Sequence, residues 1–310
     1  MWTCNDLRAK ARLVLTGKYW WAVLWTLVYT LLAGMASSIV SVISTFVFQS
    51  YGFIGTIFME SSSLQETSGS ITNKGVPASF FPQIALFILI FIAIILLMYA
   101  AIFAVMIFLT LPLSIGYQKW YFDIREGGEG KRIDPLFTAF RKNTYGRLVR
   151  GMAWKMLWSF LWALVGAIPI IISFAAIIVF TFSLSNSRAG FSNSETILFI
   201  ILTGIYMIGF GLYAVIIMNR YYAYTFTSYL LIDDPSIEYR EALKKSIAMS
   251  KGQKLHMLGL DLSFIGWWIL VALTCGYGSL FLIPYLKATQ TELYFARKAE
   301  MCEQNKESYE

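Results

Sequence analysis

The chain is poor in charge, because Asp, Glu, Lys and Arg make up only 14% of its 310 residues. Soluble domains contain about 25%. Four segments lack charged residues altogether, and each exceeds the roughly 20 apolar residues that a membrane-spanning helix requires. These segments are residues 19–48, 84–118, 156–187 and 196–219. The composition argues against a set of soluble domains and predicts an all-α, polytopic transmembrane helical bundle that forms a single membrane domain over residues 1–310.

Residues that commonly carry chemistry are scarce. The only histidine is His256, and the three cysteines, Cys4, Cys275 and Cys302, form no C-x-x-C pair. We therefore expect no disulfide framework and no zinc site. Metalloprotease, hydrolase and phosphate-loop motifs are missing, and the stretch GGEGKR at residues 127–132 lacks the spacing of a phosphate-binding loop. We expect no catalytic residues, no cofactor, no metal and no enzymatic activity.

A cleavable signal peptide is also not expected. The first uncharged run has about 30 residues, against roughly 7–15 in the apolar region of a signal peptide, and no small-x-small site closes it. This run is expected to remain as a signal anchor. The net charge of +7 does not predict a nucleic-acid partner, because basic residues on a membrane protein first mark its cytoplasmic side.

The basic residues alternate between segments. From the N-terminus to the C-terminus, the segments between the apolar runs hold 4, 1, 9, 1, 6 and 4 Lys and Arg residues. Basic segments stay in the cytoplasm, so the N-terminus and the second and fourth loops are predicted to lie inside. If the stretch CGYGS at residues 275–279 is a hairpin turn, a sixth span returns the basic tail to the inside. Without it, four positive charges would lie outside, so we expect six spans with both termini cytoplasmic, at about 19–48, 84–113, 156–183, 196–219, 255–274 and 279–298.

The chain resembles three copies of one unit, in which an amphipathic helix precedes a transmembrane hairpin. Thr3 and Asp6 form a capping box, and Asp134 and Asp234 each precede a proline, a pattern typical of a helix start. The segments PLSIGYQKWYFDIRE and PYLKATQTELYFARK also align, which pairs Tyr121-Phe122 with Tyr294-Phe295. The expected amphipathic helices are 3–17, 135–143 and 235–251.

These amphipathic helices are predicted to lie at the membrane interface. In the first, Leu7, Ala11 and Val14 would face lipid, while Arg8 and Arg12 would face water or anionic headgroups. In the third, an apolar stripe is expected at Tyr239, Leu243 and Ile247. The expected partners are therefore the lipid bilayer and anionic lipids at its cytoplasmic face. The alternative is a set of solvated loop helices without lipid contact.

Polar residues recur around the last turn of the chain. Asp261 lies before CGYGS, and Lys287, Gln290 and Glu292 lie after it. On a hairpin with a rise of about 1.5 Å per residue, Asp261 and Glu292 reach similar depths, and Lys287 lies somewhat deeper in the membrane. A charged residue at the membrane centre costs about 2.5–3.5 kcal/mol unless it is paired. The four residues are either an intramembrane polar cluster of a carrier, or the interfacial half of a short sixth span from which Lys287 reaches the headgroups.

The segments DLRAKARLVLTGKYWWAVL and LDLSFIGW, with the glycines and Pro-Tyr that follow the latter, resemble an uncharacterised bacterial family of integral membrane proteins, domain of unknown function 975. The resemblance covers nearly the whole chain, except the tail after Ala299 and the outer loops. It implies a multi-pass protein of a bacterial plasma membrane. It implies no activity and no site residues.

Two classes of function remain open at this point. One is a transport or export component, which the repeat and the polar cluster of Asp261, Lys287, Gln290 and Glu292 favour. The alternative is a membrane scaffold, immunity or envelope-stress protein without transport activity, which acts with a membrane-protein partner. An intramembrane enzyme is the least favoured, since no nucleophile and base form a recognisable set.

Overall fold

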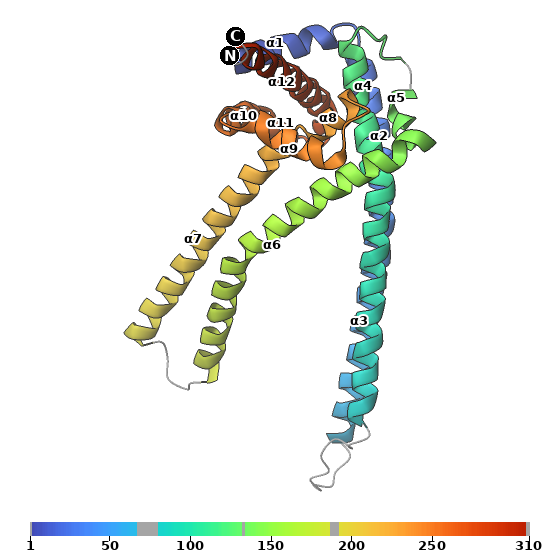
Figure 1. Ribbon diagram of the computed structural model, residues 1–310. Coiled ribbons are helices and arrows are strands. Elements are labelled where there is room, and N and C mark those ends of the chain that lie inside the picture. The colour runs from blue at the N-terminus through green and yellow to red at the C-terminus, as the bar shows by residue number, and fades with distance from the viewer. Residues whose placement is uncertain (1, 67–79, 132–133, 187–191, 308–310) are drawn as a thin grey trace. The chain divides into compact units, whose positions relative to one another are not determined.

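The computed structural model describes residues 2–66, 80–131, 134–186 and 192–307, and every regular element within these ranges is helical (Figure 1). The predicted all-α class is therefore confirmed. The α-helices are α1 (Cys4–Leu15), α2 (Tyr19–Glu66), α3 (Phe80–Val105), α4 (Leu111–Arg125), α5 (Asp134–Phe137), α6 (Lys142–Asn186), α7 (Asn193–Ala223), α8 (Thr227–Asp233), α9 (Tyr239–Ser250), α10 (Lys254–Leu262), α11 (Ile265–Leu273) and α12 (Ser279–Glu307). A π-helical turn, η1 (Met106–Thr110), joins α3 to α4, and a 3₁₀ turn, η2 (Thr138–Phe140), follows α5.

Four helical stretches in the described part of the chain are long and apolar enough to cross a membrane, which indicates a membrane protein. They are Leu89–Arg125, Thr144–Phe182, Ser194–Asp233 and Lys254–Leu273, and Tyr19–Met35 at the start of α2 is a shorter apolar stretch. Helix α12 is not one of the four, because charged residues recur along it from Lys287 onward. The count of six spans, their boundaries and the cytoplasmic position of both termini stay predictions.

The helices group into two compact units. Unit 1 comprises residues 1–26 and 115–310, and unit 2 comprises residues 27–114. In unit 2, α2 and α3 together line a cavity of about 360 Å³, with Phe48 on one helix and Phe91 on the other. Large apolar side chains of α3, such as Leu97, are exposed, which suits a helix surrounded by lipid tails. The single membrane domain expected from the sequence stays a prediction.

The core of unit 1 is rich in aromatic residues from helices that are far apart in the sequence. Trp120 and Tyr121 come from α4, Tyr229 from α8 and Tyr294 from α12, and all four are nearly inaccessible to solvent. Each large aromatic side chain buries about 150–250 Å² of surface. A few such residues therefore hold together helices that share little other contact. The hairpin of α6 and α7 joins this core, because α6 also packs against α8 and α9.

Helix α1 begins at the predicted cap, since the Thr3 hydroxyl oxygen accepts a hydrogen bond from the backbone N–H of Asp6 (3.2 Å). The apolar face of α1 packs against protein and not against lipid. Leu7 and Ala11 are buried inside the protein, and α1 packs along α12. The prediction that Leu7 and Ala11 face lipid is therefore wrong, because α12 offers a close-packed protein surface to the same stripe.

The two arginines of α1 have different environments. Arg8, expected to face water or headgroups, instead donates to the carbonyl and hydroxyl oxygens of Ser263. Its guanidinium also lies 4.6 Å from the ring centroid of Phe264. Arg12, in contrast, is exposed. Arg8 therefore ties α1 to the junction of α10 and α11, and only Arg12 has the predicted exposure.

The second and third amphipathic helices are shorter than predicted. Residues 135–143 form the brief turns α5 and η2, because the backbone is extended at Arg141 (ψ 135°) before α6 begins. The helix predicted at 235–251 is α9, which begins at Tyr239 with Glu238 as its N-cap. The first Asp-Pro pair does begin a helix, since α5 starts at Asp134, but the second pair does not, and both predicted lengths are wrong.

Asp234 closes α8 and does not start α9. Its carboxylate accepts hydrogen bonds from the backbone N–H and the hydroxyl of Ser236 (2.8 and 2.6 Å), which is a local turn that competes with helix formation. These bonds favour the charged carboxylate and hold the pKa of Asp234 below its ordinary value. The role of N-cap predicted for Asp234 is thus wrong.

The apolar stripe of α9 is also displaced around the helix. Leu243 is buried, but Ile247 is 37% exposed. The buried face is completed by Ala242, Ser246 and Met249, and the Ser246 hydroxyl donates to the carbonyl of Ala223 (2.9 Å). A small polar residue is therefore buried where the sequence pattern suggested an aliphatic one, because it bonds to the end of α7.

The chain reverses between α11 and α12. Cys275 and Gly276 have positive φ angles of 51° and 91°, and the N–H of Gly278 donates to the hydroxyl oxygen of Thr274 (2.9 Å). Helices α11 and α12 contact each other beyond this turn. The chain then continues as one helix through Pro284, so the lipid-like and the polar halves of this segment belong to a single element.

Candidate functional site

The structure places three of the four residues of the predicted polar cluster together. Asp261, near the C-terminus of α10, accepts a hydrogen bond from the Tyr222 hydroxyl of α7 (2.7 Å). Lys287 of α12 donates to Gln290 (3.2 Å), and its charge interacts with that of Asp261. The two charges are therefore near enough to influence each other, but the described residues show no ion pair or hydrogen bond between them. A functional role for them stays a prediction.

Glu292 has a different partner. It follows Lys287 by five residues, which places it about 140° around the helix. Its side chain is only 7% exposed and accepts a hydrogen bond from Nε of Arg125 on α4 (3.2 Å). The Arg125 guanidinium also lies 3.6 Å from the ring centroid of Phe295. Glu292 therefore connects α12 to α4, away from the contacts of Lys287.

Two residues near the cluster were missed in the sequence. Lys155 of α6 is partly buried, and its charge interacts with that of Lys287. It could have been found, because it is the last charged residue before the uncharged segment 156–187. Tyr222 gave no comparable signal, since it is one of 18 tyrosines. With two amines and one carboxylate, this part of unit 1 carries more positive than negative charge.

Helices α4, α8 and α12 meet in an aromatic junction, formed by Phe122, Tyr229, Tyr294 and Phe295. The ring centroids of the first three are 5.4 to 5.8 Å apart, within the range of about 4.5–7 Å that favours aromatic pairs. Phe295 adds a fourth ring, 4.9 Å from Phe122. The predicted repeat aligned the Phe122 and Phe295 segments but missed Tyr229, whose neighbours in the sequence differ.

Hydroxyl groups lie beside the aromatic core. The Tyr117 hydroxyl is 2.6 Å from Oγ1 of Thr26 and 2.9 Å from the hydroxyl of Tyr121. Among the residues described, some buried polar atoms have no hydrogen-bond partner, and these include Gln118 Oε1, Thr227 Oγ1 and the Tyr229 hydroxyl. A buried polar atom without a partner costs about 1–3 kcal/mol. The aromatic core of unit 1 therefore contains buried polar atoms as well as rings.

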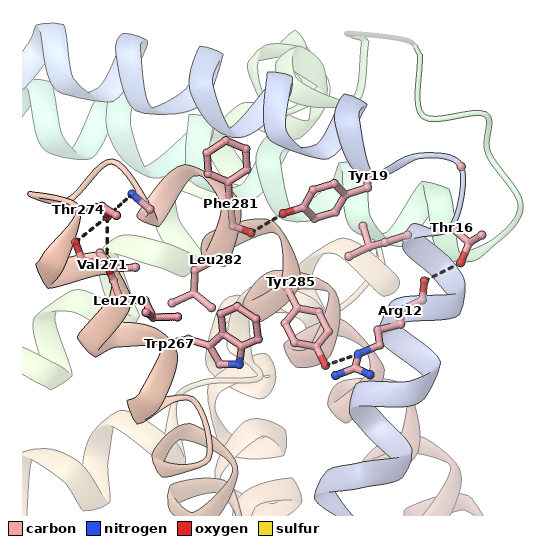
Figure 2. A pocket seen from close by; sticks show the side chains of 13 residues that line it. Arg12, Thr16, Tyr19, Trp267, Leu270, Val271, Thr274, Phe281, Leu282 and Tyr285 are labelled. Atoms are coloured by element: carbon pink, nitrogen blue, oxygen red, sulfur yellow. Dashed lines mark hydrogen bonds between the residues drawn. The ribbon is translucent and has the colours of Figure 1, made fainter.

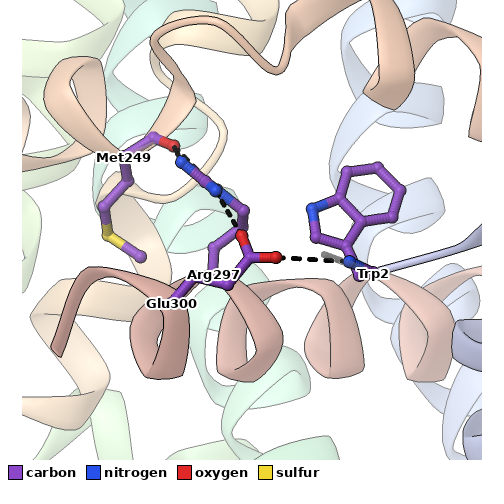
Figure 3. A network of polar contacts seen from close by, with 4 residues as sticks. All are labelled: Trp2, Met249, Arg297 and Glu300. Atoms are coloured by element: carbon purple, nitrogen blue, oxygen red, sulfur yellow. Dashed lines mark hydrogen bonds and ion pairs between the residues drawn. The ribbon is translucent and has the colours of Figure 1, made fainter. Parts of the chain in front are cut away.

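Arg297 fastens α12 to the end of α9 (Figure 3). Its Nε and Nη2 both donate to the carbonyl oxygen of Met249 (3.1 and 2.8 Å), and Nη1 donates to Glu300. Glu300 also accepts a hydrogen bond from the backbone N–H of Trp2 (3.2 Å). The carbonyl of Met249 lies in the last turn of α9, where helical donors run out. The buried Arg297 side chain therefore provides hydrogen-bond donors to the C-terminal end of α9. It also positions Glu300, which binds the backbone N–H of Trp2.

Residues 1–300 match the family described as protein of unknown function (DUF975). The chain belongs to this family. The resemblance seen in the sequence is thereby confirmed. No curated protein and no solved structure matches the chain. Because the family description gives no activity, the site residues are interpreted from their own contacts.

Proposed function

We propose that this protein is a non-enzymatic, multi-pass component of the bacterial plasma membrane that acts by binding a partner membrane protein. The proposal is supported by a contrast between two kinds of side chain in unit 1. Charged residues such as Arg125, Glu292 and Arg297 join helices of the same chain. Large apolar residues along α7 remain exposed, as Ile208 (67%) and Phe210 (53%) illustrate, and they form a surface open to lipid tails and to a partner helix alike.

The long helices α6 and α7 provide few polar groups that could form a pathway for a solute. Helices α6 and α7 pack against each other, but their segments 156–187 and 196–219 contain no charged residue. Solute pathways in membranes are marked by polar and ionisable side chains at membrane depth. A pathway beside α6 and α7 would need its polar wall from other helices, which favours a scaffold or assembly role over transport along this hairpin.

A photo-crosslinking amino acid placed in α7 tests this proposal. Ile208 and Phe210 are two residues apart, so they lie on nearly opposite sides of the helix, about 200° apart. We expect a crosslinker at one of these positions to give a discrete adduct with another polypeptide in intact membranes. The other position, exposed to a similar extent, is its matched control and is expected to give lipid adducts alone. Gel electrophoresis with mass spectrometry distinguishes the two.

The absence of a polypeptide adduct at both positions would contradict the proposal. An adduct with a second copy of the chain would identify the partner as the protein itself. Equal adducts of many sizes from both positions would show random collision and would also count against a specific partner.

A transport or export component is the second candidate, and the region of Lys155, Asp261 and Lys287 favours it. The hydroxyl of Tyr222 and the amide of Gln290 add neutral hydrogen-bonding groups beside these charges. This region suits an anionic solute, because its two lysines and one aspartate leave an excess of positive charge. The apolar segments of α6 and α7 beyond it are the reason why it ranks second.

The proposed topology predicts the labelling of the native cysteines. Cys275 lies in the exposed turn between α11 and α12, and Cys302 is exposed near the end of α12. With six spans and cytoplasmic termini, a membrane-impermeant thiol reagent added to intact cells should modify Cys275 but not Cys302. Permeabilised cells provide the control, in which Cys302 should react as well. Modification of Cys302 in intact cells would place the tail outside and leave α12 as a surface helix.

A further inference from the structure

A groove of about 600 Å³ runs between α1 and the hairpin of α11 and α12. Ligand sites in proteins commonly have volumes of about 300–1,000 Å³. The walls are mainly apolar and include Leu15, Trp267, Leu270, Phe281 and Leu282. Figure 2 shows Thr274 and Val271 toward one end of the groove and Arg12 toward the other. The groove is therefore elongated and mainly apolar, with Arg12 as the single cation among its lining residues.

Arg12 is placed to bind an anion at its end of the groove. Its Nε donates to the hydroxyl of Tyr285 (3.2 Å), and its guanidinium lies 5.7 Å from the ring centroid of the same residue. Nη1 and Nη2 have no hydrogen-bond partner among the residues described. No acidic residue lines the groove. A guanidinium oriented in this way presents two parallel N–H groups that suit a phosphate.

The position of the groove relates it to the membrane. Helix α11 lies within the candidate span Lys254–Leu273, whereas α1 precedes the apolar helix Tyr19–Met35. The groove therefore lies where a helix outside the candidate spans meets a helix that belongs to one. At such a place the acyl chain of a lipid lies along the span, and its phosphate lies beside the outer helix.

We propose that this groove binds one anionic phospholipid, with an acyl chain along Trp267, Leu270 and Phe281 and the phosphate on Arg12. The charge complementarity between Arg12 and a phosphate, together with the apolar walls, favours a phospholipid over a second copy of the chain. The inference rests on the proposed membrane location but not on the proposed partner protein.

Native mass spectrometry of the full-length protein in detergent, with added phosphatidylglycerol or phosphatidylcholine of the same chain length, tests the inference. We expect one phosphatidylglycerol to be retained, about tenfold more tightly than phosphatidylcholine. Both lipids offer a phosphate to Arg12, but the trimethylammonium group of phosphatidylcholine adds a positive charge that opposes the guanidinium. Arg12→Gln should remove this preference. Lys10→Gln is the matched control, since Lys10 is an exposed cation of α1 that does not line the groove.

The apolar half of the groove is tested separately. Leu270→Trp should fill the groove and reduce retention of both lipids, whereas Ile269→Trp, at an exposed neighbour outside the groove, should not. Tyr285→Phe removes the hydrogen bond to Arg12 but leaves the charge of Arg12 in place. This variant should keep the preference for phosphatidylglycerol, which separates the effect of the Arg12 charge from the effect of the lost hydrogen bond.

Equal retention of phosphatidylglycerol by the Arg12 and Lys10 variants would overturn the inference, as would a groove-filling variant that binds normally. A dimer that persists without lipid and dissociates in Leu270→Trp would show that a second copy occupies the groove. These results are independent of crosslinking at α7, so failure of this inference and failure of the partner proposal are distinguishable.

Discussion

Replacing Gly116 by alanine is expected to prevent α4 and α5 from packing as they do in unit 1. A Cβ atom at this position would lie 1.9 Å from the carbonyl oxygen and 2.6 Å from the carbonyl carbon of Leu136. Overpacking costs about 1–3 kcal/mol where side chains can move. Here the obstacle is backbone, so we expect a loss of about 3 kcal/mol or more in the free energy of unfolding. Thermal unfolding of the purified protein, followed by size-exclusion chromatography, measures this effect.

Gly146→Ala is the matched control for Gly116→Ala. Gly146 also lies within a helix, and an added Cβ atom there would meet nothing within 4 Å. Alanine stabilises a helix by about 1 kcal/mol relative to glycine. This variant should therefore unfold at the same temperature as the native protein or at a higher one. Equal unfolding temperatures for both variants would show that the close approach of α4 to Leu136 does not exist.

Arg297→Met is expected to loosen α12 from α9 and to lower the free energy of unfolding by about 3 kcal/mol. Methionine keeps much of the apolar stem but removes both donors to the carbonyl of Met249 and the ionic partner of Glu300. Arg297→Lys should restore little, because an ammonium group cannot reproduce the planar fork of a guanidinium. Thermal unfolding measures the change for both variants.

Lys298→Met tests whether any cation of α12 would have the same effect. Lys298 is the next residue along the helix, and its side chain is 46% exposed in an ion pair with Asp233. Exposed ion pairs contribute about 0–1 kcal/mol, so this variant should unfold close to the temperature of the native protein. If it lost as much stability as Arg297→Met, the buried contact with Met249 would not be what stabilises this helix.

The candidate site could be anticipated only in part. Asp261 and Lys287 attract notice because each is a charge beside an apolar segment, and a simple hairpin puts them near each other. Glu292 attracted notice for the same reason, but its partner Arg125 lies 167 residues away in the sequence. A hairpin argument considers two neighbouring helices, and it therefore cannot find a third helix that competes for the same carboxylate.

The faces of the amphipathic helices show the same limit. The spacing of Leu7 and Ala11 correctly marks the apolar side of α1, but periodicity does not reveal whether lipid or protein covers it. In the structure α12 covers it. On α9 the buried Ser246 interrupts the apolar pattern, because its hydroxyl bonds to the carbonyl of Ala223 in another helix. Both outcomes depend on partners that lie far away in the sequence.

The sequence by itself determined that the chain is helical and that several helices are apolar enough to cross a membrane. It also determined that the chain belongs to the DUF975 family. These properties are local, because a helix satisfies its backbone hydrogen bonds within one segment and lipid requires a long uncharged run. Only the tertiary structure decided that Phe122, Tyr229 and Tyr294 meet, that Glu292 pairs with Arg125, and that Arg12 borders an apolar groove. Those contacts depend on side-chain shape and on buried hydrogen bonds between distant segments, which no single segment encodes.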